Sequence, residues 1–104
     1  MDIQFNTDDN ISGSEGLNAV YGPSISAGLK RFSNRITRIE VHLSDENSHK
    51  GGQNDKRCLL EARLEGLQPL AVTSYADTTE KAVSRAIDKL KASLDSTLGR
   101  LKRG

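Results

Sequence analysis

The chain has 104 residues, of which 35% are hydrophobic and 28% are charged, and its formal net charge at pH 7 is +1. This size and composition favour one globular domain, residues 1–104, and argue against a disordered protein or a second independent domain. No apolar run approaches the roughly 20 residues that span a bilayer, and the acidic start, MDIQFNTDD, is unlike a signal peptide. A soluble cytoplasmic protein is therefore expected.

The charge is distributed unevenly along the chain. Through Glu80 the sequence contains 8 Lys and Arg against 12 Asp and Glu, whereas from Lys81 onward it contains 7 against 2. The C-terminal segment is therefore where an anionic partner would be attracted.

Alternation of apolar and polar residues predicts four strands. The segments are DIQFN (2–6), ITRIEVHL (36–43), RCLLEARL (57–64) and PLAVTSYA (69–76). The residues expected on the inner face of the two central segments are Ile39, Val41, Leu43, Cys58, Leu60, Ala62 and Leu64. Those expected on the outer face are Arg38, Glu40, His42, Arg57, Glu61 and Arg63. The succession of the last three strands indicates an antiparallel meander.

Apolar residues three or four apart predict two helices. The C-terminal helix should run from about residue 78 to about residue 101, with Asp77 and Glu80 forming a capping box. Its apolar stripe contains Val83, Ala86, Ile87, Leu90, Leu94, Leu98 and Leu101. The stripe of the N-terminal helix contains Leu17, Val20, Tyr21, Ile25, Leu29 and Phe32. Gly22-Pro23 predicts a kink or a break in this helix, because proline removes a backbone donor and collides with the preceding turn.

The elements follow the order β-α-β-β-β-α, which indicates an α+β fold. A helix that crosses between the first two strands favours a parallel pair, and the remaining strands add antiparallel neighbours. We expect a four-stranded mixed sheet with two helices packed on one face and the other face exposed to water.

The polar segment 44–55, within LSDENSHKGGQNDKRC (43–58), concentrates acids, amides and bases. A calcium loop counted from Asp45 would need glycine at its sixth position and glutamate at its twelfth, where the chain has Lys50 and Lys56. Residues of these types usually form a solvated turn. The segment is predicted to be the tip of a long hairpin.

No catalytic or metal-binding pattern is found elsewhere. His42, His49 and Cys58 fit no zinc spacing, and neither a phosphate-binding glycine loop nor a G-x-S-x-G nucleophile motif is present. Cys58 is expected to be a small core residue, and as the single cysteine it cannot form an internal disulfide. The sequence predicts a protein that is not an enzyme and that needs no metal or other cofactor.

One flank of the C-terminal helix is basic. At about 100° per residue, five cations fall within an arc of roughly 100° beside the apolar stripe and away from Asp88 and Asp95. These residues, called here the basic rail, are Lys81, Arg85, Lys89, Arg100 and Arg103. Lys30, Arg31 and Arg35, near the end of the first helix, would extend the rail if the helices pack side by side. Such a surface can hold a nucleic-acid backbone without reading its sequence, although solvated basic flanks are also common in helices that bind nothing.

The order of elements and two stretches of sequence resemble a known family. The stretches are RFSNRITRIEVHLSDEN (31–47) and AVSRAIDKLKASL (82–94). They are similar to the ribosome hibernation-promoting factor and ribosome-associated inhibitor A family, also described as sigma-54 modulation proteins. HLSDEN (42–47), KGGQNDKRC (50–58) and EARLEG (61–66) are similar to a short, divergent bacterial branch of that family.

The resemblance implies a fold like that of double-stranded-RNA-binding domains and a place on the small ribosomal subunit, in the channel for messenger RNA and transfer RNA. Binding and translation would then exclude each other, as in a hibernation factor of the stress response. The implied partner is ribosomal RNA, with no membrane, no small-molecule substrate and at most weak homodimerisation. In the family's Asp-Lys-Leu motif, Lys89 is the leading rRNA-binding residue. The rest of the basic rail and Lys30, Arg31 and Arg35 are expected to join it.

Two departures from the family pattern leave the affinity and the docking pose open. Ala92, Ser93 and Ser96 occupy positions where members are typically more basic, and the family lacks the Gly22-Pro23 interruption. Two alternative functions also stay open: a protein-interaction module of the same fold and an RNA-binding protein with a non-ribosomal target. The salt dependence of binding separates an RNA target from a protein target, because phosphate contacts release counterions.

Overall fold

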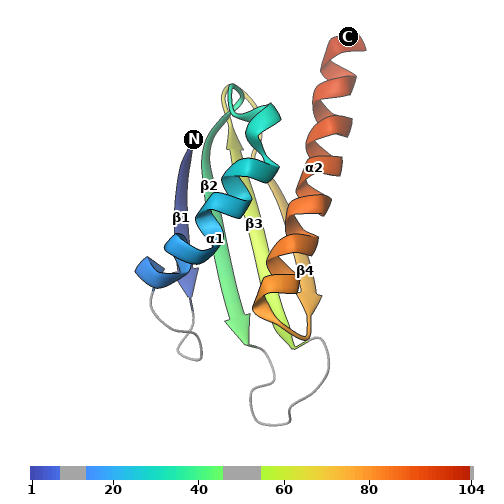
Figure 1. The fold of residues 1–104 in the computed structure, drawn as a ribbon. Coiled ribbons are helices and arrows are strands. Elements are labelled where there is room, and N and C mark those ends of the chain that lie inside the picture. The colour runs from blue at the N-terminus through green and yellow to red at the C-terminus, as the bar shows by residue number, and fades with distance from the viewer. Residues whose placement is uncertain (8–13, 46–54, 104) are drawn as a thin grey trace.

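The computed structural model describes residues 1–7, 14–45 and 55–103 (Figure 1). The elements are β1 (Asp2–Thr7), α1 (Ser14–Gly28), the short 3-10 helix η1 (Lys30–Phe32), β2 (Ile36–Asp45), β3 (Lys56–Leu64), β4 (Leu70–Ala76) and α2 (Thr79–Arg103). The predicted α+β fold and its β-α-β-β-β-α order are confirmed. The central residues 46–54 of the polar segment, including His49 and Lys50, lie outside the described residues.

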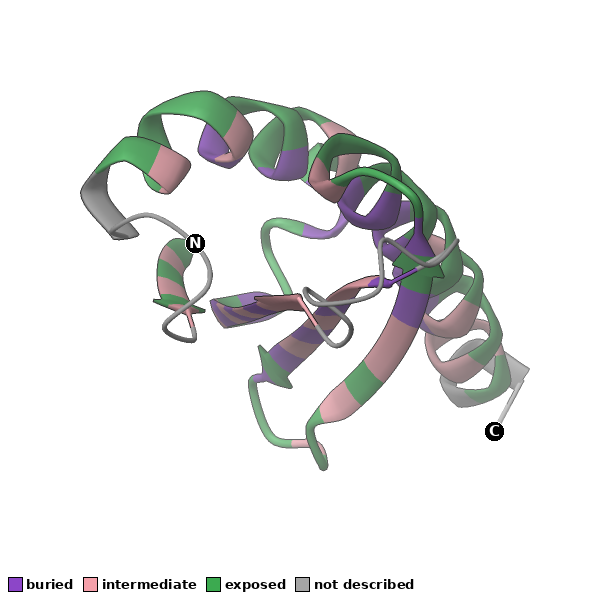
Figure 2. Cartoon of the chain, turned by 90° about the horizontal axis from the view of Figure 1, so that it is seen from below, coloured by how far each residue is buried: buried purple, intermediate pink, exposed green. Residues whose placement is uncertain are grey.

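The four strands form one mixed sheet in the order β1-β2-β3-β4. β1 runs parallel to β2, whereas β2, β3 and β4 pair antiparallel, so the predicted parallel pair and meander are both present. Seen from below, α1 and α2 lie over the same face of the sheet (Figure 2). The parallel β1–β2 connection passes through α1, because parallel neighbours need a long crossover.

The core lies between the sheet and the two helices. The predicted inner-face residues of β2 and β3 are all buried, and their outward neighbours are not. The helices contribute buried residues from their apolar stripes, namely Ile25, Leu29, Phe32, Val83, Ala86, Ile87, Leu90 and Leu94. Full burial of a leucine or isoleucine side chain stabilises the fold by about 1.5–3 kcal/mol, so this layer holds the helices on the sheet.

α1 continues through Pro23 as one helix from Ser14 to Gly28, so of the two predicted alternatives, a kink or a break, the break is wrong. Burial of Ile25 and Leu29 against the core holds the second half of the helix in place despite the proline. Val20 is also wrongly placed on the predicted stripe, because its side chain is 64% exposed. It lies about 140° around the helix from Ile25.

The start of α2 differs from the prediction by one residue. Thr78, rather than Asp77, is the N-cap, since its Oγ1 accepts a hydrogen bond of 3.1 Å from the backbone N–H of Lys81. The Asp77 carboxylate instead lies 3.2 Å from Nζ of Lys81. Threonine competes well for the cap position, and the sequence alone does not separate two adjacent candidates.

Two contacts set the positions of the helices. The buried Ser74 hydroxyl on β4 donates a hydrogen bond of 2.5 Å to the backbone carbonyl of Ala82 in the first turns of α2. At the end of α1, a Cβ atom added to Gly28 would lie 2.7 Å from Cγ2 of Ile87. The helices therefore approach closely at a position where only glycine fits.

The hairpin between β2 and β3 is closed at its base by a charge cluster. Nζ of Lys56 donates hydrogen bonds to Asp45 at 3.1 Å and to the buried Asp55 at 3.3 Å. The hydrogen bond with Asp45 raises the pKa of Lys56, which keeps the ammonium charged. Lys56, which the calcium-loop comparison placed at a ligand position, instead holds the two strands together.

Candidate nucleic-acid interface

The basic rail on α2 faces the free edge of the sheet. β4 is an edge strand, and the outward carbonyls of such a strand have no strand partner. Nη1 of Arg85 donates a hydrogen bond of 2.7 Å to the carbonyl of Tyr75, and Nζ of Lys89 donates one of 2.7 Å to the carbonyl of Thr73. These two cations therefore cover the β4 edge.

The other members of the rail lie toward the two ends of α2. Lys81 pairs with Asp77, and its hydrogen bond lowers the pKa of that carboxyl. Nη1 of Arg100 donates a hydrogen bond of 2.8 Å to the Ser96 hydroxyl one turn earlier in α2. The C-terminal end of this helix projects beyond the sheet (Figure 1). The side chain of Arg103 lies outside the described part of the structure. All four rail cations whose side chains are described thus have a partner within the chain.

The cations of the first helical segment do not extend the rail. Although α1 and α2 pack together, Lys30 and Arg31 share a hollow with Lys91, on the flank of α2 that faces α1. Lys91 lies roughly 160° around the helix from Lys89. The predicted continuous basic surface is therefore two surfaces, one on each flank of α2.

We call the second surface the groove cluster. Its members lie between η1 and the C-terminal half of α2 and are Lys30, Arg31, Arg35 and Lys91. Lys30 and Arg35 are exposed and Lys91 is partly exposed. None of these three side chains makes a hydrogen bond or an ion pair with a described residue, which leaves three cations available to an external anion.

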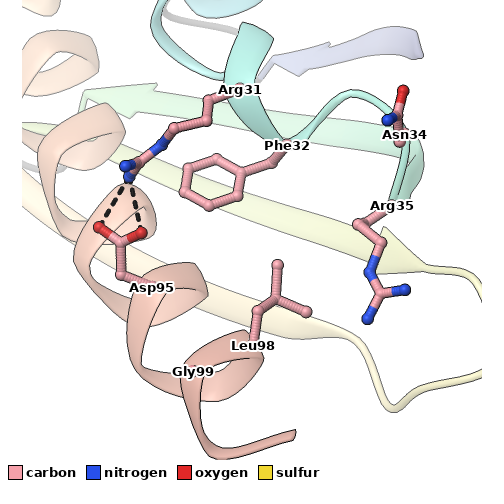
Figure 3. A pocket seen from close by; sticks show the side chains of 7 residues that line it. All are labelled: Arg31, Phe32, Asn34, Arg35, Asp95, Leu98 and Gly99. Atoms are coloured by element: carbon pink, nitrogen blue, oxygen red, sulfur yellow. Dashed lines mark hydrogen bonds and ion pairs between the residues drawn. The ribbon is translucent and has the colours of Figure 1, made fainter. Parts of the chain in front are cut away.

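Arg31 is the member of the groove cluster that is already engaged. Its Nη2 donates hydrogen bonds of 2.6 and 2.8 Å to the two carboxylate oxygens of Asp95 on α2 (Figure 3). Its guanidinium carbon lies 4.6 Å from the centroid of the Phe32 ring, within the range of a cation–π contact. The Arg31 side chain thus crosses from η1 to α2 over the buried Phe32 ring.

Lys91 is the cation that sequence reasoning missed. It lies outside the arc that defines the rail, and its neighbours in the groove, Lys30 and Arg31, are 61 and 60 residues earlier in the chain. A glycine at the end of a helix commonly serves as a C-cap, so the sequence gives no signal for the close approach between Gly28 and Ile87. Only the packed helix pair identifies the flank of α2 that faces α1.

The opposite face of the sheet carries a charge network centred on Glu40. Its carboxylate accepts hydrogen bonds from Arg38 at 2.9 Å and from Arg63 at 3.0 Å, and Nε2 of His42 lies 3.9 Å away. Partial desolvation raises the pKa of Glu40, but the hydrogen bonds from Arg63 and Arg38 outweigh this and leave the pKa below its usual value. Glu61 also lies 3.4 Å from Nη2 of Arg63, so two carboxylates together balance the charges of Arg38 and Arg63 within the sheet face.

The described residues offer no assembled metal-binding group. Within residues 1–7, 14–45 and 55–103, no three His, Cys, Asp or Glu side chains are grouped to hold a metal ion. Cys58 is buried, as predicted, and burial raises the pKa of its thiol to about 12. In the same part of the chain, no helix has the length and apolar character needed to cross a membrane.

Comparison with solved structures finds the same fold in several chains, including two bacterial proteins. A ribosomal subunit interface protein from Coxiella burnetii superposes with a TM-score of 0.71 at 19% identity, covering 95% of this chain and 99% of that one. The N-terminal domain of Protein Y from Thermus thermophilus superposes with a TM-score of 0.71 at 21% identity, covering 93% of this chain and 99% of that one. At these identities the likeness establishes the fold. No curated protein sequence matches the chain.

The family assignment comes from the sequence itself. The family model described as sigma 54 modulation protein / S30EA ribosomal protein matches residues 6–102, which run from the end of β1 to the last turn of α2. Its members are non-enzymatic factors, in agreement with the prediction that the chain is not an enzyme. The resemblance noted in the sequence is thereby confirmed, and the chain belongs to the sigma 54 modulation protein / S30EA ribosomal protein family.

Proposed function

We propose that the chain is a ribosome-associated translation inhibitor, a hibernation factor that docks on the small ribosomal subunit through the cations of its helix layer. Membership of the S30EA family supports association with the ribosome, and one protein of the same fold is described as a ribosomal subunit interface protein. The observation that carries the docking surface is the groove cluster, where three cations from two helical segments lie together without a partner among the described residues.

The groove cluster is proposed as the main contact with ribosomal RNA. A cation without an internal partner gains a phosphate contact at the cost of its hydration alone, whereas Arg85 and Lys89 would have to leave the carbonyls of β4. The rail is therefore assigned a secondary contact. Phosphate contacts of this kind give affinity and orientation without reading sequence.

Inhibition is proposed to be steric. A domain docked in the channel for messenger RNA and transfer RNA excludes both while it is bound, and no chemical step is required. The proposal places a single 1–104 domain in the cytoplasm, acting as a monomer or weak homodimer. Messenger RNA and transfer RNA in excess should then displace the protein from small subunits.

The test is co-sedimentation of the purified protein with small ribosomal subunits over a range of salt concentrations. Each phosphate neutralised contributes about −0.7 to −0.9 to the slope of log K against log salt. The variant Lys30→Gln with Lys91→Gln removes two groove cations, so its slope should be shallower by roughly 1.4–1.8 and its binding weaker. Retention of the wild-type affinity and slope would contradict the groove assignment.

The matched control removes two cations from the opposite face of the sheet, as Arg38→Gln with Arg63→Gln. Both residues are held by Glu40, so the control should bind small subunits like the wild type. If the control variant does not bind, and if binding of the wild type does not change with salt, the result would instead support a protein-interaction module on the open sheet face. Salt-dependent binding to other RNA without retention on small subunits would support the non-ribosomal target.

A further inference from the structure

The groove between η1 and α2 contains one acid among its described lining residues. The two hollows of this groove are lined by Ala27, Gly28, Lys30, Arg31 and Lys91 on one side and by Arg31, Phe32, Asn34, Arg35, Asp95, Leu98 and Gly99 on the other. Four of these residues are cations and Asp95 is the single anion. An acid in the middle of a surface proposed to bind phosphate requires an explanation.

Asp95 acts through Arg31, which lines both hollows. The Arg31 side chain reaches across the groove from η1 to α2, and both oxygens of the Asp95 carboxylate accept its Nη2 hydrogen bonds (Figure 3). This bridge separates Lys30 and Lys91 from Arg35. A phosphate backbone that follows the groove must therefore pass an arginine whose charge is already neutralised.

The ion pair between Arg31 and Asp95 is exposed to solvent, so a phosphate can reach Arg31 and replace Asp95. The Arg31 side chain is 64% exposed and that of Asp95 is 55% exposed, and exposed ion pairs of this kind are weak. The contact between Phe32 and the guanidinium does not involve Asp95, so we expect it to hold Arg31 at the surface of the groove when the carboxylate is removed. Loss of Asp95 would therefore leave Arg31 in the groove as a fourth available cation.

We propose that Asp95 is a built-in competitor of RNA phosphate for Arg31, an autoinhibitory contact that lowers the affinity of the groove. This inference rests on the proposed function. In the wild type, Arg31 contributes no counterion release while it stays on Asp95, because it then neutralises no phosphate. Asp95→Asn keeps the size of the side chain and removes this competition.

The test compares Asp95→Asn with Asp88→Asn by co-sedimentation with small subunits over a salt range. Both changes remove one negative charge from an exposed position on α2, and Asp88 makes no ion pair with a described residue. Asp95→Asn should bind roughly two- to fivefold more tightly, with a salt slope steeper by about 0.7–0.9. Asp88→Asn should show a smaller gain and an unchanged slope. The gain of Asp95→Asn should vanish when Arg31→Gln is also present.

The outcomes separate the two proposals. Equal gains from Asp95→Asn and Asp88→Asn would overturn the competitor role, because the effect would then be one of net charge alone. Unchanged or weaker binding of Asp95→Asn would also overturn it, and weaker binding would make Asp95 a positioning residue for Arg31. Absence of salt-dependent retention of the wild type itself would count against the proposed function.

Discussion

The crossing of α1 and α2 depends on the absence of a side chain at Gly28. A Cβ atom at this position would lie 2.7 Å from Cγ2 of Ile87, well inside the optimal carbon–carbon separation of about 3.5–4.0 Å. Ile87 is itself buried, so its methyl group has little room to retreat. We predict that Gly28→Ala forces the two helices apart and widens the groove between them.

The size of the effect is a balance of two terms. An extra methyl group in a packed interface costs about 1–3 kcal/mol. Replacing glycine by alanine also stabilises the folded state by about 0.4–1 kcal/mol, because it reduces the conformational entropy of the unfolded chain. Alanine fits the backbone here, since α1 is helical at this point. The net loss should be about 1–2 kcal/mol in the free energy of unfolding, which lowers Tm by roughly 5–15 °C for a domain of this size.

Urea denaturation followed by circular dichroism measures this loss. The matched control is Gly16→Ala in the same helix, where an added Cβ has no described atom within 4 Å. This control should be as stable as the wild type or more stable. Ile87→Leu lacks the Cγ2 methyl group and should recover part of the loss when combined with Gly28→Ala. If Gly28→Ala is as stable as Gly16→Ala, the close approach of the helices is refuted.

Three further predictions concern single groups in the sheet. Cys58 should resist iodoacetamide at pH 8 in the folded protein and react in urea, because burial raises its pKa to about 12; reaction at equal rates in both states would contradict its burial. Ser74→Ala should lower the free energy of unfolding by about 1 kcal/mol through loss of the hydrogen bond to Ala82, and Ser84→Ala on the exposed side of α2 should not lower it. Glu40 has a lowered pKa, so it stabilises the fold above its usual value of 4.5 and this contribution is lost as the pH falls through the folded pKa. The stability difference between wild type and Glu40→Gln should therefore be largest near neutral pH and shrink in acid, and a difference that grows on acidification would show the sign to be wrong.

The bounds and faces of the strands could be predicted from the sequence because one face of the sheet is buried and the other is exposed to water. Each strand bound differs from its prediction by at most two residues, and the inner and outer faces of β2 and β3 are as predicted. Leu59, which breaks the alternation, lies on the outer face and is only partly exposed. A period of two leaves little freedom, since a shift of one residue would turn every apolar side chain to water.

The errors in α1 have a different origin. Local propensity predicted a kink or a break at Gly22-Pro23, but no break occurs, because packing of Ile25 and Leu29 on the core outweighs the missing hydrogen bond. Helical spacing alone also placed Val20 on the apolar stripe, although only tertiary contacts decide how wide the buried stripe is. Sequence periodicity therefore identified the helix correctly, but it did not predict the continuity of the helix through Pro23 or the width of its buried stripe.

The candidate site shows where reasoning from one helix ends. Angular position on α2 correctly grouped Arg85 and Lys89, because both reach the edge of β4. Whether that flank or the opposite one borders α1 is a property of the packed pair, and it places Lys91 rather than Lys89 beside Lys30. The same crossing brings Asp95 to Arg31, 64 residues apart in the chain. A helix that looks like a one-sided basic surface in sequence thus presents two surfaces in the fold. On the first surface, the described cations bind the edge of β4 or pair with residues of α2 and of the segment that precedes it. On the second surface, Asp95 holds one of four cations.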